Sequence, residues 1–414
     1  MTFRQGNKLK RWGLDLDRRI LLLILFPISL LLIASLSPFS YAAVIAPLRS
    51  ILGGFASPLA AGRSAELNRS RIAVCLVGGA RRFELTGPSI IQRILRVYPN
   101  SDLFLHSPLD SNAYKLSLLR AAPRIAAVKI FKPTPIDETE TQTRVLTAAN
   151  SPNGIQGLLQ YFNLVEGCLT MIQDHQLKNN FTYDWIIRTR VDGYWSGNLK
   201  PEHFIPGRYV VPSGSSYGGL NDRFGAGDFN TSVVALSRLS LIPQLDAGGY
   251  ALLNSESAFK AQLTTQKVSY STHRLPFCVV TDRKYEFPPA SFGVPVAAIS
   301  SRGPLSGAKC RPCTPSCTGS CVASVMSAMD RGWSWTDWGD DTLELCDAHA
   351  DWEKGWERLF DQTAGKKLGS ARRRVKSLSF GQCVNDFEVM KEKTASWVAP
   401  PGTEICQLGG LRSV

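Results

Sequence analysis

The chain has 414 residues and a formal net charge of +13, with 44% hydrophobic and 20% charged residues. This composition excludes a disordered chain and predicts a globular protein, and the length allows one large domain with or without an appendage. The excess of Lys and Arg is typical of a surface that attracts anionic substrates such as nucleotide-sugars or acidic polysaccharides, although solubility and membrane orientation also explain such charge.

The first predicted element is an uncharged apolar segment at residues 20–46, which follows a basic tail at residues 1–19. A membrane-spanning helix needs roughly 20 apolar residues. Because Lys and Arg stay on the cytoplasmic side of a membrane, we expect a signal anchor with every later residue in the lumen or outside the cell. Small residues at 42–43 leave a cleaved signal peptide as the alternative. We therefore predict a single-pass type II membrane protein, for which nucleic acid is not an expected partner.

Residues 47–69 are rich in Ala, Gly, Ser and Pro, which predicts a flexible luminal stem. The folded part begins at residues 71–77, a continuous apolar run that indicates a buried parallel strand. The later elements expected from periodicity are a helix at 86–97, a strand at 101–106, a helix at 116–122, a strand at 126–131, a helix at 153–176, strands at 183–190 and 208–211, and helices at 231–245 and 255–266. Because strands alternate with helices, we expect an α/β fold with a mostly parallel sheet flanked by helices.

The composition changes past residue 302, so we expect an α/β domain at 70–302 and a small Cys-rich extension at 303–414, with a helix at 341–360. All ten cysteines follow the apolar segment, and an oxidising lumen favours disulfides. In a cytosolic protein the closely spaced Cys310, Cys313, Cys317 and Cys321 could ligate zinc. Seven cysteines, an odd number, cluster at residues 310–406, which makes Cys278 a candidate eighth member. Three Asn-x-Ser/Thr sequons are compatible with a luminal domain, at Asn68, Asn180 and Asn230.

Ligands of open α/β sheets bind beyond the carboxyl ends of the strands, and three polar segments stand at such positions. The first is Gly78-Gly79-Ala80-Arg81, directly after the strand at 71–77. Paired glycines allow close approach of a ligand to the backbone, and an adjacent arginine can bind a phosphate through two hydrogen bonds. The alternative interpretation is a tight turn with solvated arginines.

The second segment contains Arg188, Arg190 and Asp192 at the end of the strand at 183–190. Alternation along a strand places these three side chains on one face. Charges on an otherwise apolar strand are costly unless they are paired or bind a ligand. Asp192 could hold Mn²⁺ or Mg²⁺ bridging a diphosphate. The alternative interpretation is an internal Arg–Asp salt bridge that orders the loop.

The third segment, residues 219–227, surrounds Asn221, Asp222 and Arg223 with glycines. Such a segment is typical of a mobile loop that covers a ligand, and Asp222 could deprotonate a hydroxyl or complete a metal site. A plain turn is the alternative. Glu256, at the start of the helix at 255–266, is either a site carboxylate or a partner of the helix dipole.

The order of these segments along the chain resembles that in Golgi glycosyltransferases of the GT-A type. The residues that carry the resemblance are Gly-Gly-Ala-Arg-Arg-Phe at 78–83, Asn-Ser-Asp-Leu-Phe-Leu-His at 100–106, Trp-Ile-Ile-Arg-Thr-Arg-Val-Asp at 185–192 and Asn-Asp-Arg-Phe-Gly at 221–225. The chain is most similar to an uncharacterised family of plant type II membrane proteins that end in a Cys-rich segment with Asp-Asp-Thr-Leu-Glu-Leu-Cys, here 340–346. The likeness covers about residues 70–410.

The resemblance implies a GT-A-like catalytic domain at 70–302, in a Golgi membrane protein that transfers a sugar from a nucleotide-sugar donor to a glycan or glycoprotein. The residues it implies are Asp222 or Glu256 as catalytic base and, for donor binding, Gly78, Gly79, Arg81, Arg188, Arg190, Asp192, Asn221 and Arg223. GT-A enzymes carry Asp-x-Asp, whereas Tyr194 here stands at the second position after Asp192. Either Asp192 acts with Asp222 on a metal, or the arginines neutralise the diphosphate without a cation.

Two other functions fit the same residues. A non-catalytic binding or scaffold protein of the Golgi could keep the fold without the second aspartate of the Asp-x-Asp pattern. A luminal hydrolase would instead use paired carboxylates across a cleft, with no basic pocket of diphosphate size beside them.

Overall fold

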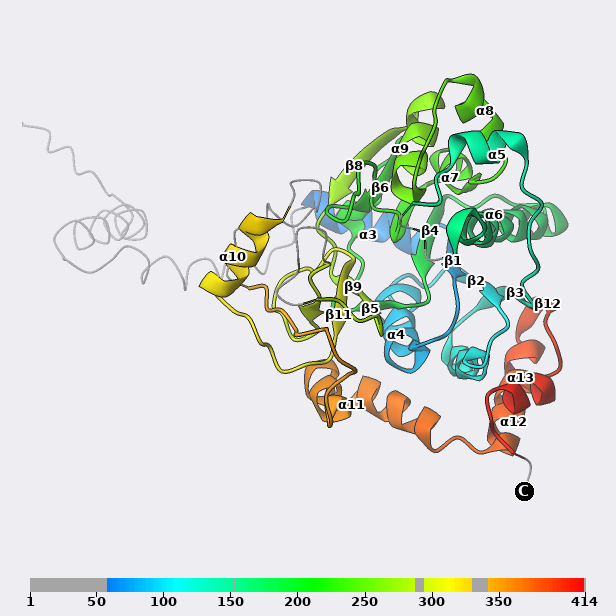
Figure 1. Ribbon diagram of the computed structural model, residues 1–414. Helices are drawn as coiled ribbons and strands as arrows, with labels where there is room; N and C mark the ends of the chain where they lie inside the picture. Colours follow the sequence, from blue (N-terminus) through cyan, green and yellow to red (C-terminus); the bar gives the residue numbers. More distant parts are fainter. Residues whose placement is uncertain (1–57, 150, 152, 287–293, 330–341, 413–414) are drawn as a thin grey trace, which may run out of the picture. The chain divides into compact units, whose positions relative to one another are not determined.

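The computed structural model describes residues 58–149, 151, 153–286, 294–329 and 342–412 (Figure 1). The predicted cytoplasmic tail and the apolar segment at 20–46 lie outside these residues. Among the described residues, no helix is both long and apolar enough to span a bilayer. Within the predicted stem, Pro58–Arg69 form helix α3 rather than an irregular linker, and Leu67 on this helix is buried in the core.

An eight-stranded sheet organises the fold, in the order β12-β3-β2-β1-β4-β7-β6-β8 (Figure 1). Its strands are β1 (Ile72–Val77), β2 (Ser101–Pro108), β3 (Ile125–Phe131), β4 (Trp185–Arg190), β6 (Arg208–Pro212), β7 (Phe224–Asp228), β8 (Ser269–His273) and β12 (Thr394–Val398). The five strands from β12 to β4 run parallel, and β7 joins β4 in the antiparallel sense. The predicted α/β class with a mostly parallel sheet is confirmed.

Strand β1 lies at the centre because its side chains are apolar on both faces. Val74 and Leu76 face one core, and Ala73, Cys75 and Val77 face the other. Helices cover both faces, as a parallel sheet requires. The first core includes α4 (Phe83–Ile90), the 3₁₀ segment Ala113–Ala121 and α12 (Phe380–Glu392), and the second includes α6 (Gly154–Asn179), α7 (Phe229–Leu236) and α9 (Ser255–Thr265).

A smaller sheet has the order β10-β11-β9-β5. Its strands are β5 (Gly193–Trp195), β9 (Phe277–Val280), β10 (Ala297–Ala298) and β11 (Ala308–Arg311). Strand β5 follows β4 almost directly, so the smaller sheet continues from the end of a central strand. Strands from both sides of the predicted boundary at 302 pair in this sheet, and β12 joins the large one. Residues of the predicted extension are therefore built into both sheets.

All ten cysteines form disulfides, which confirms the disulfide prediction and the partnership of Cys278 with the Cys-rich segment. The pairs are Cys75–Cys168, Cys278–Cys310, Cys313–Cys346, Cys317–Cys321 and Cys383–Cys406. The first pair ties β1 to α6, and the second ties β9 to β11. No thiol is left to bind zinc.

Three predicted helices differ from the structure. The helix at 86–97 begins earlier, at Phe83, and ends in a π-helical turn, Ile91–Leu95. The helix at 231–245 is two helices, α7 and α8 (Ile242–Ala247), and Pro243 in the first turn of α8 cannot continue a preceding helix. The prediction of a helix at 341–360 is wrong for 342–355, where Leu345 instead forms β-bridges. Helix α11 (Trp356–Lys376) begins only after Gly355, which adopts a left-handed conformation.

Candidate functional site

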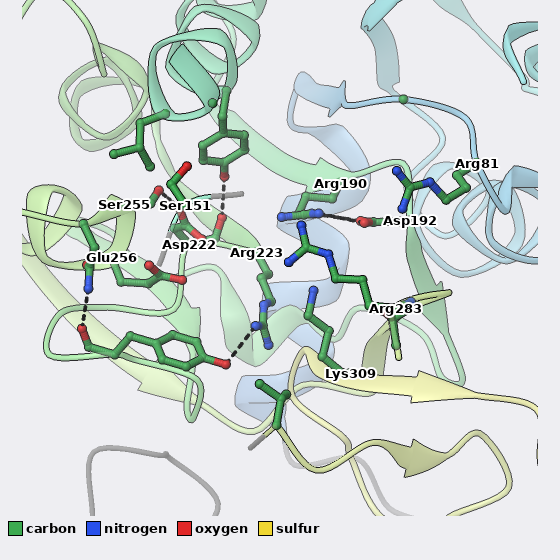
Figure 2. Close-up of a pocket in the computed structure, with 18 of the residues that line it drawn as sticks. Arg81, Ser151, Arg190, Asp192, Asp222, Arg223, Ser255, Glu256, Arg283 and Lys309 are labelled. Carbon is green, nitrogen blue, oxygen red and sulfur yellow. Dashed lines mark hydrogen bonds and ion pairs between the residues drawn. The ribbon is translucent and has the colours of Figure 1, made fainter. Parts of the chain in front are cut away.

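A cavity of about 900 Å³ lies at the carboxyl ends of β1 and β4 (Figure 2). Its wall also includes the segment before β7, the first turn of α9, and β11. The charged residues that line it are Arg81, Arg82, Arg190, Arg223, Arg283 and Lys309, with Asp110, Asp192, Asp222 and Glu256. The three polar segments predicted from the sequence therefore meet at one cavity, because the parallel strands β1 and β4 end, and the antiparallel β7 begins, at the same edge of the sheet.

The first segment contributes Gly79 and Arg81 to the cavity wall, whereas Gly78 lies behind it. Gly78 has φ +120°, and a Cβ atom there would lie 3.0 Å from the Val191 Cγ2 atom. Its backbone is held on both sides, since its N–H donates to the carbonyl of His106 and its carbonyl accepts from the Ser107 hydroxyl at 2.8 Å. Gly78 shapes the turn, and Gly79 and Arg81 face the cavity.

Arg190 and Asp192 form a two-point ion pair in the cavity wall. The Arg190 Nε and Nη2 atoms donate to the two carboxylate oxygens of Asp192 at 2.8 and 2.7 Å. Burial opposes ionisation of both groups, but the pairing outweighs it and holds the pKa of Asp192 below and that of Arg190 above the ordinary value. The salt bridge of the alternative interpretation is therefore present, and both of its residues line the cavity.

Arg188 does not reach the cavity, contrary to its predicted role in donor binding. It is 1% exposed, and its Nη1 atom donates to the Tyr161 hydroxyl at 3.0 Å. Alternation does place Arg188 and Arg190 on one face of β4. A strand rises about 3.3 Å per residue, however, so Arg188 starts about 6.6 Å further from the strand end. The side chain of Tyr161, which itself lines the cavity, lies between.

In the third segment, Asn221 contacts only protein groups, whereas Arg223 lines the cavity. Asn221 is 1% exposed and bonds only the protein, because its amide donates to the carbonyl of Ser306 at 3.2 Å and accepts from the N–H of Arg223 at 3.1 Å. The prediction that Asn221 contacts the donor is therefore not supported by its position. Arg223 does line the cavity, and its Nη1 atom donates to the Ser215 hydroxyl at 2.7 Å and to the carbonyl of Gly307 at 2.6 Å.

Asp222 is an anchored carboxylate. It is 3% exposed, its Oδ2 atom accepts a hydrogen bond from the Ser255 hydroxyl, and the same oxygen lies 3.8 Å from the Arg238 Nη2 atom. Burial alone would raise the pKa of Asp222, but Arg238 and Arg188 outweigh it and lower the pKa below the ordinary value. Asp222 is consequently ionised and committed to protein partners.

Glu256 has the opposite electrostatic character. It lies in the first turn of α9, whose N-terminus is capped by Asn254 through a hydrogen bond from the N–H of Ser257 at 2.8 Å. Burial and the neighbouring Asp222 carboxylate raise the pKa of Glu256 to about 8. In the described part of the chain, Glu256 is in no ion pair. A half-buried carboxyl group with such a pKa can both accept and donate a proton near neutral pH.

Sequence reasoning missed two cations of the cavity wall. Arg283 follows β9, and Lys309 lies on β11. Neither residue stands in one of the three polar segments, and Lys309 lies in the Cys-rich segment. One signal was available: Lys309 stands between Ala308 and Cys310, and a charged residue between two small buried ones in a strand must have a reason to be there.

Asp192 and Asp222, the two carboxylates predicted to act on a metal, are not free to bind the divalent cation that the resemblance implies. Both oxygens of Asp192 are bound by Arg190, and Asp222 is engaged by Ser255 and Arg238. Within the described ranges, no group of three or more His, Cys, Asp or Glu side chains is arranged to hold a metal ion. We therefore derive no catalytic step through a metal.

Comparison with known protein families finds that a family model described as "Domain of unknown function (DUF7796)" matches residues 67–412. The comparison with curated proteins finds no similar sequence. The matched range includes every residue of the cavity wall named above.

Proposed function

Because the chain belongs to the DUF7796 family, whose description names no activity, we propose its function from the cavity: it is a glycosyltransferase that uses a nucleotide-sugar donor. The observation that carries the proposal is the separation of charge across one cavity. Figure 2 shows Glu256, with Ser255 and Ser151, on one side, and Arg190, Arg283 and Lys309 on the other. One wall suits a proton transfer and the other suits a diphosphate.

The basic wall suits the donor. Arginine and lysine side chains bind phosphate oxygens through charge-assisted hydrogen bonds, and they stabilise the negative charge that develops on a departing diphosphate. Tyr161, Tyr217 and Tyr285 also line the cavity and offer aromatic faces to a base or a sugar ring. A hydrolase with two opposed carboxylates would not need this basic wall.

Glu256 is the proposed catalytic base. In its ionised form it removes the proton from an acceptor hydroxyl, and the oxygen forms a bond to the anomeric carbon of the donor sugar. The bond from that carbon to the diphosphate breaks, and its electron pair leaves with the nucleoside diphosphate. This in-line displacement inverts the anomeric centre. Of the two predicted candidates, Asp222 is the less suitable, because its carboxylate is already bound by Ser255 and Arg238.

The finer features predicted from the resemblance form part of this proposal. The GT-A type of fold is compatible with the mixed α/β sheet and with ligand residues at the strand ends. Five disulfides are typical of an oxidising compartment, which supports a luminal position. Anchoring in the Golgi membrane through residues 20–46, with a glycan or glycoprotein as acceptor, completes the proposal.

The test uses the full-length chain, purified with its disulfides intact and incubated with a panel of nucleotide-sugars with and without Mn²⁺. We expect hydrolysis of one donor, or transfer from it to a hydroxyl acceptor. Glu256→Gln should lower kcat by roughly 10²- to 10⁴-fold and leave donor binding in place, because it removes the base and keeps the shape of the side chain. Glu140→Gln, on an exposed side chain in α5 (Glu140–Val145), is the matched control.

A second candidate, a non-catalytic binding protein, is favoured by one observation: Asp192 is neutralised by Arg190. It predicts that donors bind, that none is hydrolysed or transferred under any condition, and that Glu256→Gln changes nothing in the cell. That combination would reject the transferase.

A further inference from the structure

Lys309 presents its amino group to the cavity. It lies on β11, where Ala308 and Cys310 on either side are buried in the opposite direction. In the described part of the chain, no carboxylate pairs with Lys309 and no carbonyl accepts from it. The Lys309 side chain nevertheless lines the cavity. A charged group held in a partly desolvated wall is costly unless it binds a ligand.

Cationic side chains surround this amino group. Figure 2 shows the ends of the Arg190, Arg283 and Lys309 side chains converging on the same space, with Arg223 beside them. Burial, followed by Arg223 and Arg190, lowers the pKa of Lys309 well below the ordinary value. The nearest opposing charge is Asp192, which is already bound to Arg190. The lowered pKa favours the neutral amine of Lys309 before an anion binds, whereas Arg223 and Arg283 form no ion pair with a carboxylate of the described residues. An anion of two or three charges would neutralise these arginines and favour the ammonium form of Lys309.

The scaffold holds these cations in place. Strand β11 pairs with β9 through Lys309 opposite Val279, and the disulfide Cys278–Cys310 joins the adjacent positions of the two strands. Arg223 is fixed to the start of β11, because it donates to the carbonyl of Gly307 at 2.6 Å. Groups fixed before the ligand arrives need no reorganisation on binding.

A divalent cation does not fit in the same space. It would approach the guanidinium groups of Arg190, Arg223 and Arg283, and the Asp192 oxygens that could bind it already accept from Arg190. In water of low ionic strength and in a partly enclosed cavity, this repulsion is poorly screened. The side chains themselves supply the positive charge that a metal would bring.

We propose that Lys309, together with Arg223 and Arg283, binds the diphosphate of the donor directly, in place of a divalent cation. This inference rests on the proposed function in its choice of a nucleoside diphosphate as ligand. It assigns to the Cys-rich part of the chain a residue of the donor site.

The experiment measures binding of UDP, GDP and inorganic pyrophosphate to the full-length chain by calorimetry, in EDTA and, for the nucleotides, again with Mn²⁺. We expect at least one nucleoside diphosphate to bind in EDTA, with a Kd that Mn²⁺ changes less than about threefold. Lys309→Met should weaken that binding at least tenfold, since it removes a charge-assisted contact. Lys309→Arg should retain most of it. Lys200→Met, at an exposed side chain outside the cavity, should have no effect.

Should Lys309→Met fail to fold, Arg283→Gln tests the same wall and should weaken binding at least fivefold. Binding that requires Mn²⁺, or that is unchanged in both variants, would overturn the inference while leaving the transferase in place. Lys309-dependent binding of pyrophosphate in EDTA, with no nucleoside diphosphate bound, would support the anion site and reject the donor class. Absence of all binding would reject both.

Discussion

Asp222 and Glu256 are neighbouring carboxyl groups that their surroundings drive in opposite directions. Asp222 lies near two cations, Arg238 and Arg188, and accepts from the Ser255 hydroxyl. It is therefore ionised, but its carboxylate is already bound by protein groups. Glu256 gains burial and the negative charge of Asp222, so it resists ionisation. Two acidic groups with separated pKa values are the usual mark of distinct acid–base roles. The charge of the anchored aspartate thereby raises the pKa of the glutamate.

At the level of single residues, ionisation of Glu256 should lower the free energy of unfolding as the pH rises. Its pKa in the folded state is about 8, above the ordinary 4.5, so its contribution to the free energy of unfolding is intact below pH 4.5 and is lost as the pH rises to about 8. Gln cannot ionise. We expect Glu256→Gln to raise Tm at pH 8 by roughly 5–10 °C, because a pKa rise from 4.5 to about 8 corresponds to on the order of 5 kcal/mol, and to raise it much less at pH 5.

Scanning calorimetry at the two pH values measures this difference, with Glu140→Gln as control for the loss of an exposed carboxylate. An equal change of Tm at pH 5 and pH 8 would show that Glu256 ionises normally in the folded protein. Its assignment as the base would then lose its electrostatic support.

At the scale of elements, the glycine-rich segment is packed rather than open. A Cβ atom on Gly219 would lie 1.9 Å from the carbonyl oxygen of Glu256, and the next N–H, that of Leu220, donates to the same carbonyl at 3.0 Å. Further along, β7 pairs with β4 in place of the predicted loop. The glycines here permit close approach of backbone to backbone, which the sequence pattern alone does not distinguish from mobility.

Gly219→Ala should therefore displace the first turn of α9, which carries Glu256. We expect kcat to fall at least tenfold, since a displacement near 1 Å is enough to disturb a catalytic group, and Tm to fall as well. Donor binding at the opposite wall should change less than threefold. Gly381→Ala is the control, because a Cβ atom there meets nothing within 4 Å and the position is in helix α12. An unchanged kcat in Gly219→Ala would contradict the assignment of Glu256 as the catalytic base.

For the whole molecule, the strands that follow residue 302 complete sheets that begin earlier in the chain. Strand β12 pairs with β3 at the edge of the large sheet, and β11 pairs with β9 in the small one (Figure 1). Gly62–Val414 accordingly form one compact unit. The proposed donor site needs this arrangement, because Lys309 reaches the cavity only when β11 is in place.

Removing the disulfide that joins β9 to β11 should affect both stability and binding. The pair Cys278–Cys310 closes a loop of 32 residues, for which the chain-entropy relation gives about 3–4 kcal/mol. We expect the double variant Cys278→Ser, Cys310→Ser to lower Tm and to weaken diphosphate binding. The control is Cys317→Ser, Cys321→Ser, whose sequence separation of 4 gives a smaller entropic loss and no effect on binding. Equal binding in both double variants would contradict a role of β11 in the site.

The sequence by itself determined the elements whose signal is local. The apolar run at 71–77 predicts the buried strand β1, the helical apolar stripe at 153–176 predicts α6, and the polar segments after β1 and β4 stand where ligands of parallel sheets bind. An even set of cysteines behind an apolar segment was sufficient to predict disulfides, but not their connectivity.

Only the tertiary structure decided which charges face the cavity and in what state. Arg188 and Arg190 are equivalent in the pattern of β4, and their difference comes from Tyr161 on a distant helix. Lys309 joins the site through strand pairing across many residues, which no local pattern encodes. A pKa depends on every charge within several ångströms, so the contrast between Asp222 and Glu256 exists only after the chain has folded.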